Sequence, residues 1–146
     1  MKRLLIVLIA VLGFASCENI ESSPYEFSIN AKNGADEKKE VKFNVTPFIV
    51  DSLKISKTTL IRMASDAARY ADWNVKNKLT YDFNENELVG NMIFLNDDNI
   101  TISIKGKASN SYGVPGEITS FIYFDIETKE MITDENQFPK VDSHEL

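Results

Sequence analysis

Apolar and polar residues alternate in two stretches that follow residue 24. Every second position is apolar from Tyr25 to Ile29 and again from Val41 to Val45. This period of two is typical of strands with one buried face. The polar residues 30–40 between them include Asn33-Gly34, so we expect a loop there and a hairpin overall. Pro47 cannot donate a ladder hydrogen bond, which suggests an edge position or a bend after the second strand.

The spacing of apolar residues changes to a helical period between residues 56 and 76. One predicted face carries Leu60, Ala64, Ala67, Ala68, Ala71 and Val75. The opposite face is polar, with Arg62/Asp66 and Asp66/Arg69 at spacings that allow ion pairs. Ser56 or Thr58 can cap the start of this helix. The alanine-rich face predicts close packing against a sheet.

Strand-like segments return after the helix. We expect strands at residues 79–83, 88–95, 99–107 and 117–126, and a short one at 131–132. Asn96-Asp97-Asp98 is typical of a tight hairpin turn between two of them. In the third segment Ile100, Ile102 and Ile104 should face the core, while Thr101, Ser103 and Lys105 face a wetter side.

These elements predict an α+β fold, with one amphipathic helix packed on a mainly antiparallel sheet of about five to seven strands. The order of elements resembles that of cystatin-like and related helix-plus-sheet folds. The sequence contains no motif of any such family, and unrelated activities share such folds. The resemblance therefore implies a scaffold and not an activity.

The first residues have the order of a secretory signal peptide. Lys2 and Arg3 precede an apolar run, and small residues precede Cys17. The run is shorter than the roughly 18 to 20 residues that span a bilayer, which disfavours a permanent transmembrane helix. We therefore expect a signal peptide at 1–16, a short polar tether at 17–24 and a single α+β domain at 25–146.

Phe14-Ala15-Ser16-Cys17 resembles the lipobox of bacterial lipoproteins, although Phe14 stands where most lipoboxes have an aliphatic residue. The resemblance implies cleavage before Cys17 and lipid on its sulfur, with the mature protein anchored at the outer membrane and facing the periplasm or the cell surface. Cys17 is the only cysteine, so it cannot form an internal disulfide. The alternative is an incidental thiol near the end of an apolar segment.

The negative net charge of the chain disfavours one class of partner, nucleic acid. Removal of residues 1–16 takes Lys2 and Arg3 away, so 16 basic residues become 14 against 22 acidic ones and the net charge falls from −6 to −8. Such a surface repels phosphate backbones, so we expect no nucleic-acid partner.

Few residues suit catalysis or metal binding. The sole histidine is His144, near the end of the sequence given, so a Ser-His or Cys-His nucleophile is disfavoured. Zinc sites need several His or Cys ligands, which this chain lacks. Residues 82–87 resemble the start of a calcium loop, but Glu87 replaces the required glycine, and a solvated turn is the better interpretation. We expect no metal and no cofactor.

The loop at residues 109–116 is the one candidate ligand or partner site. Asn110, Ser111 and Tyr112 place hydrogen-bonding groups and an amphipathic aromatic ring between two strands. The alternative, favoured by its turn-forming residues, is a structural turn in which Tyr112 folds back onto the sheet and Asn110 bonds nearby backbone.

The leader, the tether and the missing catalytic set favour a non-catalytic binding or assembly module of the cell envelope. Its partner would be an envelope protein, a peptide or a polysaccharide. One alternative is an inhibitor or immunity-type protein that blocks an enzyme with the 110–116 loop. The least favoured is a carboxylate-based hydrolase, for which the sequence singles out no pair of acids.

Overall fold

The first two strands form the predicted hairpin in the computed structural model, which describes residues 25–72, 75–83, 88–96 and 99–134. β1 (Glu26–Lys32) pairs antiparallel with β2 (Lys38–Val45), and Ile29 lies opposite Val41. The turn between them is shorter than the loop predicted at 30–40. It is short because the side chain of Asn33 closes it, accepting bonds from the backbone N–H groups of Ala35 and Glu37 at 3.0 and 2.9 Å.

Pro47 begins a short helix, α1 (Pro47–Asp51), instead of marking an edge or a bend. The fixed φ of proline suits the first helical position, where an N–H group has no helical partner to bond. Ile49 is buried, and α1 contacts the strand β4 (Leu88–Asn96).

The long helix α2 (Lys57–Tyr70) begins where the sequence predicted and ends earlier. The Ser56 hydroxyl accepts a bond from the N–H of Thr59 at 3.2 Å and caps the helix. The six apolar residues of the predicted face, from Leu60 to Val75, are all buried. The helix ends at Tyr70, and just beyond it the carbonyl of Ala71 accepts a bond from the hydroxyl of Ser120, which lies far along the chain.

Residues 79–83 do not form the predicted strand. They contain a 3₁₀ turn, η1 (Lys78–Thr80), and the two-residue strand β3 (Asp82–Phe83). The turn closes when Thr80 and Tyr81 donate to the carbonyls of Asn77 and Lys78, both at 3.0 Å. These bonds, and that from Gly34 to the Tyr81 carbonyl, use the groups that a longer ladder would need.

Three strands form an antiparallel unit in the second half of the chain. β4, β5 (Asn99–Ser109) and β6 (Pro115–Asp125) pair in chain order, with Ile102 opposite Ile122. The hairpin turn predicted around residues 96–98 lies partly outside the described residues. The short strand predicted at 131–132 is a single bridge, from Met131 to Phe124.

A short parallel pairing between β2 and β4 joins the two antiparallel units. The strand order is β1-β2-β4-β5-β3, with β6 on the remaining edge of β5. The α+β class is thus confirmed. The antiparallel units, of two and three strands apart from β3, are smaller than the mainly antiparallel sheet of about five to seven strands that the pattern predicted, because the β2–β4 pairing that joins them is parallel.

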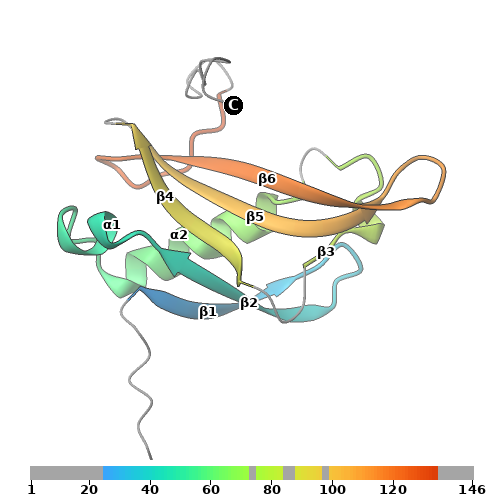
Figure 1. Cartoon of the computed structure of the whole chain (residues 1–146), viewed down its shortest axis with the longest axis horizontal. Helices are drawn as coiled ribbons and strands as arrows, with labels where there is room; N and C mark the ends of the chain where they lie inside the picture. The colour runs from blue at the N-terminus through green and yellow to red at the C-terminus, as the bar shows by residue number, and fades with distance from the viewer. Residues whose placement is uncertain (1–24, 73–74, 84–87, 97–98, 135–146) are drawn as a thin grey trace, which may run out of the picture.

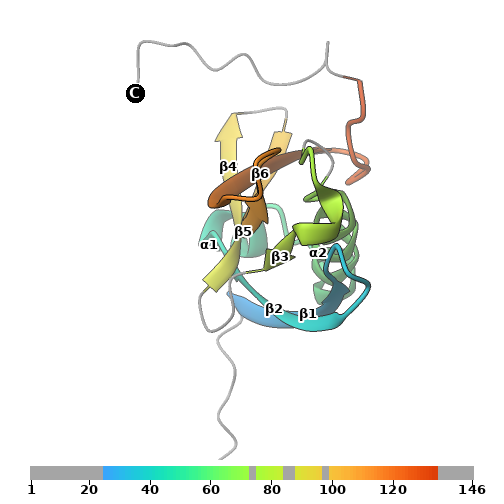
Figure 2. The same ribbon diagram turned by 90° about the vertical axis from the view of Figure 1, so that its right-hand side faces the viewer.

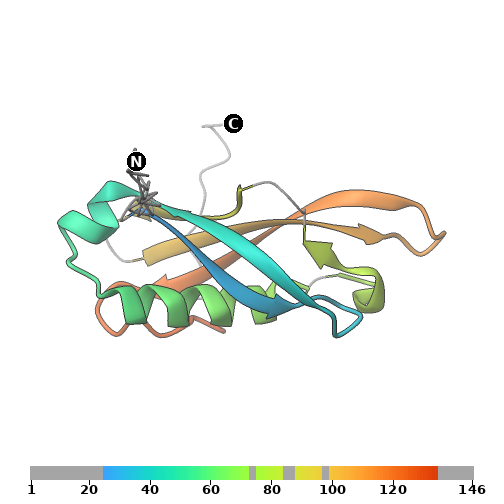
Figure 3. The same cartoon turned by 90° about the horizontal axis from the view of Figure 1, so that it is seen from below.

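The strands curve around α2 and bring distant parts of the sheet to the same helix (Figure 1, Figure 2). α2 contacts β1, β5 and β6, and it runs along one side of the strands (Figure 3). The core lies between the helix and the sheet, and its fully buried members include Val41, Phe43, Met63, Ala64, Ile100, Ile102, Ile104 and Phe124.

One residue on the predicted wetter side of β5 is buried. Thr101 is fully buried and its hydroxyl has no hydrogen-bond partner among the described residues, while Lys105 is exposed as predicted. The cross-strand neighbour of Thr101 is the large side chain of Tyr123, which is itself only partly exposed. Directly opposed side chains lie within contact range, and we attribute the burial of Thr101 to this neighbour.

Candidate functional site

The predicted site residues form the turn that joins β5 to β6 at one end of the sheet (Figure 1). The Asn110 carboxamide oxygen accepts bonds from the backbone N–H groups of Tyr112 and Val114 at 2.9 and 3.1 Å. Two backbone bonds also close the turn, from Asn110 to Val114 and from Gly113 to Asn110. Gly113 has φ +78°, which a side chain would disfavour. The backbone of the turn is therefore held in one conformation.

Tyr112 does not fold back onto the sheet. Its side chain is 89% exposed, and Ser111 and Val114 beside it are exposed as well. The sequence favoured a structural turn in which Asn110 bonds nearby backbone and Tyr112 folds back onto the sheet. The first part is confirmed, because Asn110 bonds the backbone of the turn. The second part is wrong, because Tyr112 points into solvent. We call Asn110, Ser111, Tyr112, Gly113 and Val114 the hairpin tip.

A second apolar side chain is exposed on the element next to the hairpin. Leu79 of η1 is 76% exposed. η1 lies beside the end of β5, because the N–H of Ser109 donates to the hydroxyl of Thr80 at 2.9 Å. The sequence did not single out Leu79, since an apolar residue next to Thr80 and Tyr81 matched a buried strand.

A cleft of about 360 Å³ lies between the β1–β2 turn and the C-terminal half of α2. Most of its lining side chains are polar: Asn30, Lys32, Asn33, Asp36, Ser65, Arg69, Asp72 and Tyr81. They come from three segments that are far apart in the sequence. The residues between Asn30 and Asp36 were expected to form only a loop, so nothing in the sequence connected them with α2 or with Tyr81.

The β1–β2 turn is fixed to the segment that carries Tyr81. Gly34 donates its N–H to the carbonyl of Tyr81 at 2.8 Å, and the Asn33 carboxamide donates to Asp82 at 3.1 Å. A Cβ on Gly34 would stand 1.7 Å from the carbonyl oxygen of Lys78, so only glycine permits this approach. The position of the β1–β2 turn beside the cleft is therefore fixed by close backbone contacts.

Tyr81 is 2% exposed, and its hydroxyl has no hydrogen-bond partner among the described residues. Burial raises the pKa of this hydroxyl well above its usual value, and the negative charges of Asp72 and Asp82 raise it further. The hydroxyl is thus neutral at physiological pH. It can donate one hydrogen bond and accept others.

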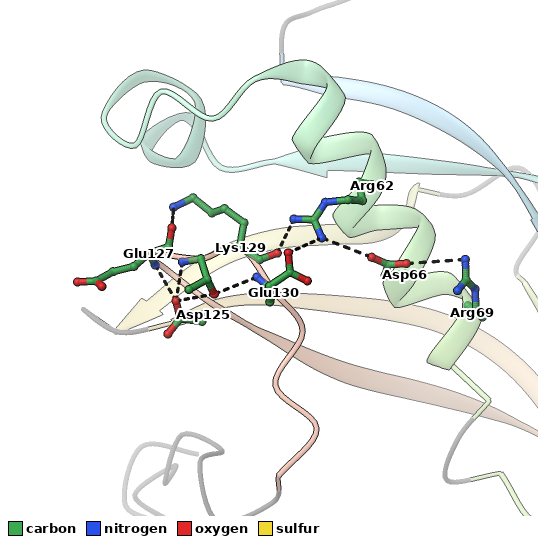
Figure 4. A network of polar contacts seen from close by, with 8 residues as sticks. Arg62, Asp66, Arg69, Asp125, Glu127, Lys129 and Glu130 are labelled. Atoms are coloured by element: carbon green, nitrogen blue, oxygen red, sulfur yellow. Dashed lines mark hydrogen bonds and ion pairs between the residues drawn. The ribbon is translucent and has the colours of Figure 1, made fainter.

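A polar network at the other end of α2 holds the helix to the turn after β6 (Figure 4). The Arg62 guanidinium donates to the carbonyl of Lys129 at 2.8 Å and pairs with Glu130 at 3.2 Å. It also lies 3.9 Å from Asp66, which lies 3.8 Å from Arg69. These last two pairs are the ones that the helical spacing predicted.

Asp125 organises the turn to which Arg62 binds. Its carboxylate accepts bonds from the N–H groups of Glu127 and Thr128 and from the Thr128 hydroxyl, at 2.9, 2.7 and 2.9 Å. The bonds from Thr128 are the main reason why the pKa of Asp125 lies below its usual value. All these groups are used within the turn, so we interpret the network as structural.

Several sequence predictions fall outside the described residues, namely the signal peptide, Cys17, the tether, His144 and most of the calcium-like segment. Within the residues that the structure describes, no group of three or more His, Cys, Asp or Glu side chains is placed to hold a metal ion. In the same part of the chain, no helix is both long and apolar enough to cross a membrane.

Comparison with known proteins gives no relative, since no protein-family model, no curated protein and no solved structure matches this chain.

Proposed function

We propose that this chain is an exported, lipid-anchored protein of the cell envelope that acts as a non-catalytic binding module, with the hairpin tip as its partner surface. The supporting observation is the almost complete exposure of Tyr112 on a turn whose backbone is closed by four hydrogen bonds. A large ring that is exposed on an ordered turn contributes contact area to a partner and loses little conformational entropy on binding.

The anchor and tether belong to the same proposal. Lipid on Cys17 would hold the mature protein at the outer membrane. Residues 17–24, fully extended at about 3.3 Å each, would reach roughly 25 Å, so the domain would act close to its membrane. For the whole domain, residues 25–146, we propose one amphipathic helix on a mainly antiparallel sheet of about five to seven strands, with the tip at one end of the sheet.

Site-specific photocrosslinking in cells tests the tip. A photoreactive phenylalanine replaces Tyr112 in one variant and Phe48 in a matched control, since Phe48 is an exposed aromatic residue on α1. We expect a discrete adduct from position 112 and none from position 48, because only the tip contacts the partner. Absence of an adduct at 112, or equal adducts at both positions, would contradict the proposal.

A measurement of affinity then tests whether Tyr112 contributes binding energy and does not merely touch the partner. Once the adduct identifies the partner, Tyr112→Ala should weaken the affinity by about tenfold or more, as is typical of aromatic residues at the centre of an interface. Phe121→Ala removes another exposed aromatic side chain from β6 and should change the affinity little.

The inhibitor alternative uses the same rigid, protruding turn. If the partner is an enzyme whose turnover falls when the purified chain is added, and recovers with Tyr112→Ala, the inhibitor is the better description. A partner without catalytic activity supports the assembly module.

A further inference from the structure

β6 forms one edge of the sheet and begins directly after the hairpin tip (Figure 1). It pairs with β5 along its whole length of 11 residues, from Asp125 opposite Asn99 to Pro115 opposite Ser109. The other side of an edge strand presents backbone N–H and C=O groups to which a further strand can pair. This side of β6 is therefore a possible interaction surface.

The backbone groups of alternate β6 residues point away from β5. In an antiparallel ladder every second residue exchanges hydrogen bonds with the partner strand, and the residues between them direct their groups to the opposite side. The Tyr123 carbonyl accepts a bond from the N–H of Ile132 at 2.9 Å. The Asp125 N–H donates to the carbonyl of Glu130, also at 2.9 Å. Both bonds lie on the side away from β5, so the odd-numbered residues of β6 face outward.

Residues 130–132 cover one end of this edge and leave the other end open. Within the described part of the chain, the outward backbone groups of Glu117, Thr119 and Phe121 make no hydrogen bond. The same three residues are exposed. The antiparallel bridge from Met131 to Phe124 shows that the edge accepts a further segment, and the open part continues the same edge. We call the outward backbone of Glu117, Thr119 and Phe121 the open edge.

The features that usually protect an edge strand from pairing are missing from this part of β6. Charged side chains, proline and bulges are the common ones. No charged residue, proline or glycine occurs from Ile118 to Phe124, and the β5–β6 register has no bulge. Residues of this kind, β-branched and aromatic, also favour strand pairing. The open edge is thus suited to an added strand.

The spacing of the open groups decides which kind of partner fits. Outward residues repeat about every 6.6 to 6.8 Å along a strand, and each offers one donor and one acceptor. Another extended polypeptide carries complementary groups at the same repeat, whereas the hydroxyl groups of a polysaccharide do not. The open edge begins three residues after Val114 of the hairpin tip, so a partner that contacts the tip also lies beside it.

We propose that the partner of the hairpin tip adds an extended polypeptide segment to β6, bonded to the backbone of Glu117, Thr119 and Phe121. This inference rests on the proposed function and narrows its partner to a protein or a peptide. Main-chain hydrogen bonds supply most of the affinity in this mode of recognition. Loss of the Phe121 side chain should therefore still change the affinity little.

Amide hydrogen exchange of the purified full chain, followed by NMR, tests whether the edge is open. The amides of Thr119 and Phe121 should exchange at least about tenfold faster than those of Ile118 and Ile122, whose backbone groups face β5. Equal protection of the two sets would show that the edge is closed, and it would overturn this inference whatever the tip binds.

Proline substitution tests in cells whether the partner pairs with the open edge. Thr119→Pro removes an outward N–H group and no bond of the β5–β6 ladder, and edge strands tolerate proline at such positions. With photoreactive phenylalanine at position 112, Thr119→Pro should reduce the adduct by about fivefold or more. Thr119→Val, the matched control, should leave it unchanged. Mass spectrometry of the digested adduct should find a peptide attached to position 112.

The outcomes separate this inference from the proposed function. An undiminished adduct in folded Thr119→Pro, or a glycan in place of the attached peptide, would overturn the inference while the tip remains a binding surface. If position 112 gives no adduct at all, both are wrong. Thermal unfolding checks that Thr119→Pro is folded. If it is not, Glu117→Pro takes its place at the neighbouring open position, and the same loss of adduct is expected.

Discussion

The ring of Tyr81 lies directly on the backbone of Gly106. A Cβ built on Gly106 would stand 2.7 Å from ring atoms Cε2 and Cζ and from the hydroxyl oxygen. Gly106 is buried in β5, and the Tyr81 ring also packs edge-on against Phe83, with ring centroids 5.5 Å apart. The ring is therefore enclosed, and it cannot move aside without disturbing its neighbours.

Gly106→Ala should therefore destabilise the protein by about 1 to 3 kcal/mol, the usual cost of overpacking a core. Gly116→Ala on β6 is the control, because a Cβ there meets nothing within 4 Å, and its effect should be small. Urea unfolding followed by circular dichroism measures both free energies of unfolding. Equal stabilities of the two variants would mean that Tyr81 tolerates the added methyl group.

Arg62→Lys should cost about 0.5 to 1.5 kcal/mol of folding stability, although the charge is kept. The planar guanidinium reaches both the Lys129 carbonyl and Glu130, whereas a lysine ammonium at one point cannot reproduce this fork. Arg69→Lys is the matched control on the same helix. The Arg69 side chain is 71% exposed and makes one long ion pair, at 3.8 Å, so its replacement should change stability little. Thermal unfolding measures the stability of both variants, and an identical loss of stability in the two would rule out a special role for Arg62.

Asp125 should make the fold sensitive to acid. Its pKa is lower in the folded protein than in the unfolded chain, whose value is near 3.8. Its contribution is therefore complete above the unfolded pKa and is lost as the pH falls through the folded pKa. Asp125→Asn keeps an oxygen acceptor but cannot titrate, so stability should decline less steeply between about pH 5 and pH 2. Urea midpoints at several pH values measure this slope, and parallel slopes for wild type and variant would refute the prediction.

Cys17→Ser should release the protein from membranes without unfolding the domain. The lipid requires the sulfur, and Cys17 precedes the predicted domain and forms no internal disulfide. Membrane fractionation with mass spectrometry of the wild-type N-terminus measures this. An unacylated Cys17, or a wild-type protein that leaves the membrane in buffer without detergent, would refute the lipoprotein proposal.

Predictions from the sequence succeeded where the information is local. The helical period between Leu60 and Val75 marked the buried face of α2, and alternation marked β1, β2, β5 and β6. Asn110 in a turn sequence indicated the side chain that closes the hairpin tip. Each pattern reflects bonding or burial within a few residues, which neighbouring side chains specify directly.

Tertiary structure alone decided the features that join distant segments. The parallel contact of β2 with β4, and the bond from the Ser120 hydroxyl to the Ala71 carbonyl just beyond α2, join partners that no local pattern names. The exposure of Tyr112 follows from where the sheet ends, not from the residue itself. The cleft exists because Gly34 lets the β1–β2 turn approach the Lys78 carbonyl, which brings Asn30, Asp72 and Tyr81 around one space. Sequence spacing fixes the period of a strand or helix, whereas such contacts arise only after the elements have packed.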